Sequence, residues 1–296
     1  MHEIKTITEL HAIRPKLRGQ VGLVPTMGYL HEGHLSLLAS AKETCDSVIA
    51  TIFVNPTQFA EGEDLDSYPR NLERDFSLLE DAGADAVFIP TPQLMYPPRF
   101  QTWVTVDEVT QGREGGQRPE HFRGVTTVVN KLFNLTQADI AFFGQKDAQQ
   151  VVVIRRMVYD LNMSIEIEVC PIVREDDGLA LSSRNVYLSS EDRQAALILN
   201  QTLRDIGQLY EQGERNPDTL RRIASEKISA EEHAKLDYVS LAEADTLEEI
   251  TQASDKPLLL SLAAQVGKPR LLDNCLLPLS LNTREGVTQT LGKINR

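Results

Sequence analysis

The sequence predicts an α/β fold, with a Rossmann-like parallel sheet in the N-terminal part followed by a smaller α+β C-terminal domain. Over the first 175 residues, short β-branched runs alternate with stretches in which apolar residues recur every three or four positions. Such alternation is typical of buried parallel strands joined by amphipathic helices. After Asn185 the pattern changes to a long polar helical region followed by three strand-like runs. We therefore place a boundary near 174–186 and expect domains at 1–175 and 176–296.

The expected strands of the first domain are apolar runs with few charges and turn residues nearby, at 21–25, 48–54, 86–89, 140–143 and 165–173. Helical spacing of apolar residues lies between them, at 35–45, 72–79, 125–133 and 151–158. The second domain is expected to hold a helical region at 190–229, strands at 235–241, 257–266 and 270–276, and a hairpin turn at 267–269. Open parallel sheets bind ligands in the crevice at the carboxyl ends of their strands, so we look for a site there.

The charge balance excludes some classes of partner. Lys and Arg number 30 against 43 Asp and Glu, which gives a net charge of −13. Nucleic acids and anionic membranes require a basic surface, so we expect neither as a partner. A small anion remains possible, because it needs only a locally positive pocket. The three separated cysteines, the lack of a signal-like start and the lack of a 20-residue apolar run favour a soluble cytoplasmic protein.

The first candidate motif follows the strand at 21–25 and contains two histidines three residues apart, His31 and His34, which share one face of a helical turn. Gly28 allows a tight turn, and the N–H groups at the start of a helix together with two imidazoles suit a phosphate. The HExxH zinc motif needs histidines four residues apart, which excludes it here. The alternative is a pair of surface histidines. The motif comprises Met27, Gly28, Tyr29, Leu30, His31, Glu32, Gly33 and His34.

The second motif ends the strand at 48–54. Asn55 and Gln58 offer paired donors and acceptors that suit a carboxylate or a hydroxyl group. A plain Asn-Pro turn is the alternative.

The third motif again leaves a strand and enters a helix. Gly144 permits close backbone approach, Lys146 would place a point charge on a phosphate, and Gln150 lies one turn further on the same face. A surface lysine at a helix start is the alternative, although the helix dipole disfavours a cation there. Gln145 and Asp147 complete the motif.

The fourth motif lies at the domain boundary. Ser182, Ser183 and Arg184, preceded by Leu181, could clamp a polyphosphate and close over it. An ordinary polar linker is the alternative. Asp75 could help to hold Mg²⁺, but we favour the interpretation that it is a carboxylate on a helix surface. Because three motifs follow parallel strands directly and the fourth follows the last of them, we expect the four loops to converge on one crevice.

Taken together, these motifs resemble the pantothenate synthetase (pantoate–β-alanine ligase) family. The HxGH sequence alone is shared by the wider nucleotidylyltransferase superfamily, whose members bind ATP and attack its α-phosphate, so the combination carries the resemblance. It is dense up to residue 190 and weaker beyond. Gln145 stands where relatives often carry Glu, a variation that we expect to have no consequence. The matching segments are 25–28, 31–34, 53–56, 58–59, 68–70, 121–125, 146–147, 181–185 and 270–274.

The resemblance implies an ATP- and Mg²⁺-dependent condensation in two half-reactions. The carboxylate of pantoate attacks the α-phosphate of ATP, giving pantoyl adenylate and pyrophosphate, and the amine of β-alanine then displaces AMP to give pantothenate. A carboxylate with a pKa of about 4 is already ionised at pH 7, so the first step needs no general base. It needs in-line positioning and neutralisation of the phosphate charge, which His, Lys, Arg and Mg²⁺ supply.

The resemblance also implies roles for individual residues. It assigns catalysis to His31, His34, Lys146 and Arg184, and the binding of pantoate or β-alanine to Asn55, Gln58 and Gln150. The implied ATP-binding positions are 27–34 and 144–147, then Val173, Leu181, Ser182, Ser183 and Arg184. Members of the family are typically homodimers through the N-terminal domain. Two other functions stay open from the residues alone: nucleotidyl transfer onto a phosphorylated acceptor, and nucleotide sensing without turnover.

Overall fold

The structure, a computed structural model, describes residues 1–60, 62–63 and 65–294. It divides into two compact units, which are described here one at a time. The first contains Met1–Phe143 and Gln149–Cys170, and the second contains Gly144–Ala148 and Pro171–Arg296. Whether 1–175 and 176–296 are the domains of this chain stays a prediction.

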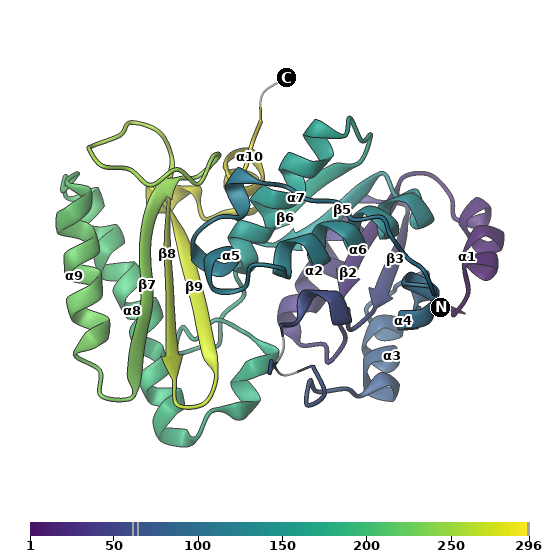
Figure 1. Cartoon of the computed structure of the whole chain (residues 1–296), viewed down its shortest axis with the longest axis horizontal. Coiled ribbons are helices and arrows are strands. Elements are labelled where there is room, and N and C mark those ends of the chain that lie inside the picture. Colours follow the sequence, from purple (N-terminus) through teal and green to yellow (C-terminus); the bar gives the residue numbers. More distant parts are fainter. Residues whose placement is uncertain (61, 64, 295–296) are drawn as a thin grey trace. The chain divides into compact units, whose positions relative to one another are not determined.

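The first unit is built on a six-stranded sheet, which confirms the α/β prediction (Figure 1). In sheet order the strands are β1 (His2–Ile4), β4 (Ala86–Phe88), β3 (Ser47–Ile52), β2 (Val21–Thr26), β5 (Ile140–Gly144) and β6 (Glu166–Cys170). The pairs β1–β4, β4–β3, β3–β2 and β2–β5 are parallel. Strand β1 was not predicted, because three residues carry no detectable period. Strand β6 ends earlier than expected, since Pro171 follows it and has no N–H to donate.

Helices cover both faces of this sheet. The helices of this part of the chain are α1 (Ile7–Ile13), α2 (Glu32–Thr44), α3 (Leu72–Asp81), α4 (Pro92–Met95), α5 (Arg113–Gln117), α6 (His121–Thr136) and α7 (Ala148–Asp160). One core lies between the sheet and helices α2 and α3, and includes Leu38, Leu79 and Val48. Leu23 and Ile49 are also fully buried, although strand alternation points them to the opposite face. Burial on both faces explains why these strands read as continuous apolar runs.

The second unit contains an antiparallel sheet covered by two helices (Figure 1). Strands β7 (Ala234–Glu243), β8 (Leu258–Val266) and β9 (Arg270–Leu277) pair in that order, and the predicted turn at 267–269 joins the last two. Helices α8 (Ser190–Glu211) and α9 (Pro217–Ser229) pack on them, and α10 (Arg284–Thr290) follows. The region predicted as one helical stretch is thus two helices. Gly213 adopts φ +102° after α8, and Pro217 opens α9.

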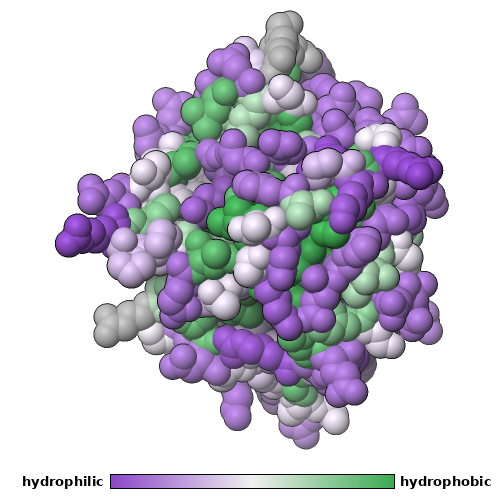
Figure 2. Space-filling model, turned by 90° about the vertical axis from the view of Figure 1, so that its right-hand side faces the viewer, coloured by the Kyte–Doolittle hydropathy of each residue, from purple (hydrophilic) through white to green (hydrophobic). Residues whose placement is uncertain are grey.

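The face of the molecule in Figure 2 is mostly hydrophilic. Figure 2 shows hydrophilic side chains over most of the face it presents, with hydrophobic ones gathered between them. All three cysteines are buried and unbridged, as expected of small apolar residues. Among the helices of the described ranges, none has the length and apolar character needed to span a membrane.

Candidate active site

The loop between β2 and α2 has a strained backbone that a buried carboxylate holds in place. Gly28 adopts φ +82° and Tyr29 φ +51°, a region that residues other than glycine rarely enter. The N–H groups of Tyr29 and Leu30 donate to the two oxygens of Asp75, at 2.7 and 2.8 Å. A Cβ at position 28 would lie 3.0 Å from the same carboxylate. The loop therefore needs glycine at position 28 and an acceptor at position 75.

Asp75 belongs to the first turn of α3 but does not lie on its surface, because only 1% of the residue is exposed. The interpretation of Asp75 as a helix-surface carboxylate is therefore wrong. Both carboxylate oxygens are engaged by backbone amides of the loop. Coordination of Mg²⁺ by Asp75 stays a prediction, and the structure gives the carboxylate a positioning task.

The two histidines of this loop lie at the start of α2. His31 is the N-cap residue, and its Nδ1 accepts from the N–H of Gly33 at 3.1 Å. The N–H of His31 in turn lies 3.4 Å from Nδ1 of His34, and the ring centroids are 4.1 Å apart. A neutral imidazole that accepts at Nδ1 carries its proton on Nε2. In this tautomer each ring carries its proton on Nε2, beside the N-terminus of a helix.

Asn55 and Gln58 are parts of one hydrogen-bond network after β3. The amide nitrogen of Asn55 lies 3.1 Å from Oε1 of Gln58 and 3.2 Å from the carbonyl of Gly124. Its oxygen accepts from the hydroxyl of Tyr96 at 2.8 Å and from Thr57. Asn55 is only 1% exposed. Its hydrogen-bonding groups are thus engaged within the protein, and the substrate contact that the resemblance implies for Asn55 stays a prediction.

The backbone of Gln58 is also held by hydrogen bonds, which its carbonyl oxygen accepts. Nη2 of Arg118 donates to its carbonyl oxygen at 3.0 Å, and Nδ1 of His121 lies 2.8 Å from the same atom. Arg118 is itself held by Glu63 through two contacts of 2.5 Å. Burial, assisted by the charge of Arg118, lowers the pKa of His121, so its neutral ring donates to the carbonyl.

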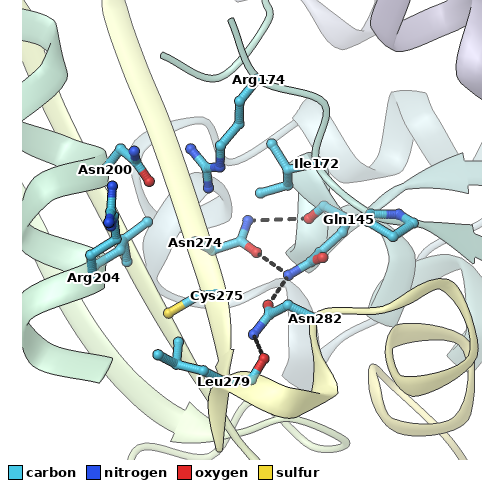
Figure 3. Close-up of a pocket in the computed structure, with 11 residues that line it drawn as sticks. Gln145, Ile172, Arg174, Asn200, Arg204, Asn274, Cys275, Leu279 and Asn282 are labelled. Carbon is cyan, nitrogen blue, oxygen red and sulfur yellow. Dashed lines mark hydrogen bonds between the residues drawn. The ribbon is translucent and has the colours of Figure 1, made fainter. Parts of the chain in front are cut away.

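In the second unit, amide side chains support the segment that carries Lys146 (Figure 3). Nε2 of Gln145 lies 2.9 Å from Oδ1 of Asn282 and 3.3 Å from Oδ1 of Asn274. Nδ2 of Asn274 donates back to the backbone carbonyls of Gln145 and Lys146, at 3.1 and 3.0 Å. The ammonium of Lys146 lies 4.0 Å from the carboxylate of Asp147, the limit of an ion pair. The backbone around Lys146 is thus fixed by neutral groups.

These amides form one side of a pocket of about 230 Å³ within the second unit. Arg174, Asn200 and Arg204 line it as well, and Figure 3 shows Arg174 above the Asn274 side chain. Arg174 forms a bidentate ion pair with the buried Asp273, at 2.6 and 2.9 Å. Three of the polar side chains that line the pocket, the amides of Gln145, Asn274 and Asn282, thus form one network, and Arg174 is neutralised by Asp273.

The fourth motif follows a short hairpin of the same unit. The N–H of Leu181 donates to the carbonyl of Val173 at 3.0 Å, and Ser182 caps the following turn by accepting from the N–H of Arg184. Arg193 of α8 holds the hairpin through Glu175 and Asp177, at 2.5 and 2.6 Å. The motif is thus an ordered, pinned loop.

The structure brings the predicted residues together in two groups, one in each unit. The first group holds residues 27–34, Asn55, Gln58 and Asp75, and the second holds 144–147, Val173 and 181–184. Gln150 belongs to the first unit, in α7, and its side chain forms no hydrogen bond with the described residues. Convergence of all four loops stays a prediction. Sequence reasoning missed Tyr96, Arg118 and Asn282 as supports, whereas His121 and Asn274 stood in segments that had been noted.

A parallel sheet with paired imidazole donors on a strand-to-helix loop defines a Rossmann-like α/β protein suited to binding phosphate groups. The family model described as pantoate-beta-alanine ligase matches residues 2–276. The chain therefore belongs to that family of ligases.

Individual relatives agree with this assignment. The chain is 54% identical to the pantothenate synthetase of Roseiflexus sp. strain RS-1 over 277 residues, which cover 94% of this chain and 99% of the relative. It is 50% identical to the pantothenate synthetase of Acetivibrio thermocellus over 279 residues, covering 93% and 99%.

Solved structures give the same result. A crystal structure of the Thermus thermophilus pantothenate synthetase matches with a TM-score of 0.87 at 43% identity, covering 93% of this chain and 98% of that one. The pantoate-beta-alanine ligase of Francisella tularensis, complexed with beta-gamma ATP and beta-alanine, matches with a TM-score of 0.75 at 34% identity, covering 93% and 97%.

Proposed function

We propose that the chain condenses pantoate with β-alanine at the expense of ATP, through a pantoyl-adenylate intermediate, and releases AMP and pyrophosphate. The observation that carries the proposal is the pair of Nε2–H donors of His31 and His34 at the N-terminus of α2. Donors on a preorganised backbone stabilise charge that develops on a phosphate without reorganising during the reaction. Family membership supplies the class of substrate, and the complex of the Francisella relative contains ATP and β-alanine.

In the first half-reaction the carboxylate of pantoate attacks the α-phosphate, and the bond to the pyrophosphate leaving group breaks. His31 and His34 donate to phosphate oxygens, and Lys146 and Arg184 supply positive charge to the polyphosphate. Gly144, Gln145, Asp147 and Val173 line the nucleotide, while residues 181–183 close over its phosphates. Because the nucleophile is already an anion at pH 7, no residue has to remove a proton from it.

In the second half-reaction the amine of β-alanine attacks the acyl carbon of the adenylate, and AMP leaves. Gln58 and Gln150 hold the pantoyl group, with Asn55 behind Gln58. The nitrogen loses a proton as the amide forms, and the phosphate of AMP leaves as an anion that the same donors stabilise. The homodimeric assembly implied by the resemblance belongs to this proposal.

Mg²⁺ is proposed to enter with the nucleotide. Within the described ranges, no group of three or more His, Cys, Asp and Glu side chains could hold a metal ion, so these residues do not fit a resident Mg²⁺ site. Mg²⁺ keeps most of its waters and is commonly bound through substrate phosphates, with one or two carboxylates.

The proposal is tested by measuring AMP release with ATP, pantoate and β-alanine, omitting each substrate in turn. We expect AMP to accumulate only with all three, and pyrophosphate exchange into ATP to require pantoate but not β-alanine. A product that retains the AMP moiety would favour nucleotidyl transfer, and ATP binding without turnover would favour a nucleotide sensor.

A further inference from the structure

The network around Asn55 determines which end of the Gln58 amide is turned away from Asn55. A backbone carbonyl can only accept and a backbone N–H can only donate, so these two groups orient an amide without ambiguity. The carbonyl of Gly124 lies 3.2 Å from one end of the Asn55 amide, and the N–H of Thr57 lies 3.4 Å from the other. The first end must therefore be the nitrogen of Asn55 and the second its oxygen.

The orientation of the Asn55 amide determines the orientation of the Gln58 amide. The Asn55 nitrogen also lies 3.1 Å from the side chain of Gln58, which must present its oxygen there. Nε2 of Gln58 is consequently turned away from Asn55, toward Sδ of Met27 at 3.1 Å. Thioether sulfur is a weak acceptor, and the amide nitrogen carries two protons, so a donor remains for a ligand.

Tyr96 completes the network from a separate part of the chain. Its hydroxyl lies 2.8 Å from the oxygen of Asn55 and 3.1 Å from that of Thr57. Burial raises the pKa of Tyr96, so the hydroxyl keeps its proton. The ring is stacked near Trp103, with centroids 6.1 Å apart, and this contact limits its movement.

We propose that Tyr96 and Asn55 are positioning residues that make Gln58 present a hydrogen-bond donor, so that Gln58 selects an oxygen of pantoate rather than the ammonium group of β-alanine. The inference rests on the proposed function. A carboxylate or hydroxyl oxygen accepts from an amide N–H, whereas an ammonium group has only donors and would repel it. To present its oxygen where Nε2 now lies, Gln58 would have to invert its amide, and the Gly124 carbonyl prevents the inversion through Asn55.

The test compares two variants that each remove one hydroxyl group from the first unit. Tyr96→Phe deletes the bond to Asn55, whereas Tyr159→Phe, at the end of α7, serves as the matched control. We expect Tyr96→Phe to raise KM for pantoate about three- to tenfold, the usual effect of losing one neutral hydrogen bond. KM for ATP and β-alanine and kcat should stay within about twofold of wild type, and Tyr159→Phe should match wild type throughout.

A double-mutant cycle separates positioning from general destabilisation. In a Gln58→Ala background, Tyr96→Phe should have no further effect on KM for pantoate, because the group that it positions is gone. An unchanged KM for pantoate in Tyr96→Phe, equal changes for all three substrates, or an undiminished effect in Gln58→Ala would overturn the inference. A wild-type chain that does not consume pantoate would overturn the proposed function, and this inference with it.

Discussion

The two loops that carry the phosphate-binding candidates are held in place by different means. The His31–His34 loop of the first unit depends on one buried carboxylate, Asp75, which accepts two backbone N–H groups. The Lys146 segment of the second unit depends on neutral amides, Asn274 and Asn282 around Gln145. Charged hydrogen bonds are stronger than neutral ones, and a buried donor that loses its acceptor costs more than the bond was worth.

This difference suggests that the two loops differ in how rigidly they must be held. The histidine loop has two successive residues at positive φ, so its strain must be offset by strong contacts, and it is expected to be rigid. The Lys146 segment starts from Gly144 in an ordinary extended conformation (φ −85°). It carries no backbone strain there, so weaker contacts are enough to keep it ordered. The predictions below test whether activity and stability follow this difference.

The largest effect on the rate of adenylation is expected from removing the ammonium group of Lys146 in the second unit. Lys146→Ala should lower the rate of adenylation by about 10²–10³, because it removes a donor to the developing phosphate charge. Pyrophosphate exchange measures this step alone. Lys235→Ala, on a strand of the same unit, is the control, and a near wild-type exchange rate in Lys146→Ala would remove Lys146 from the mechanism.

The corresponding change in the first unit is His34→Ala. We expect adenylation to fall by about 10², with little change in thermal midpoint, because the hydrogen bond that its Nδ1 accepts from the backbone N–H of His31 is long, at 3.4 Å. His11→Ala, on an exposed face of α1, is the control. A large fall in thermal midpoint with a modest loss of rate would instead favour the alternative of two structural histidines.

The contributions of Asp75 and Asn274 to the free energy of unfolding can be compared by replacing each with alanine. Asp75→Ala should destabilise the first unit by about 3 kcal/mol, because two backbone N–H groups lose their acceptors, and Asn274→Ala should cost the second unit about 1 kcal/mol. Denaturant unfolding of both variants, read with probes in each unit, gives the two values. Equal losses would contradict the contrast between charged and neutral supports.

The smallest effect concerns an exposed pair in the second unit. Nδ1 of His233 lies 3.0 Å from the carboxylate of Asp192, and Gly267 of the β8–β9 turn packs against that carboxylate. The hydrogen bond to Asp192 raises the pKa of His233, and the bond to His233 lowers the pKa of Asp192.

The raised pKa of His233 gives stability that is fully present below its unfolded value of 6.5 and is lost as pH rises through the folded pKa. The lowered pKa of Asp192 gives stability that is present above 3.8 and is lost as pH falls through its folded pKa. The thermal midpoint of His233→Gln should thus fall below that of wild type mainly at pH values between the folded pKa of Asp192 and the folded pKa of His233. A difference that persists at pH 9 would contradict the ion pair.

Much of the fold follows from local patterns. Buried parallel strands read as apolar runs such as 48–54, and the Gly213 and Pro217 that separate α8 from α9 were visible as helix-breaking residues, although the region was predicted as one stretch. The histidine loop was located by its spacing after a strand. Three-residue elements such as β1 were missed, because so short a run carries no period.

The hydrogen bonds that hold these loops in place could not be predicted, because they join residues far apart in the chain. Asp75 reads as one of several carboxylates in an amphipathic helix, and nothing local shows that it reaches a loop 45 residues away. Tyr96 lies 41 residues from Asn55, in a segment with no noted motif.

By itself, the sequence determined the fold class, the acidic balance of charge and the residue types that can contact a phosphate or a carboxylate. Tertiary structure alone decided which polar atoms those residues have left to offer. A side chain such as Asn55 has the same donors and acceptors wherever it stands, but burial makes it satisfy them with the nearest partners. Only the positions of the Gly124 carbonyl and the Tyr96 hydroxyl therefore reveal that Asn55 turns inward and that Gln58 turns its amide nitrogen away from Asn55.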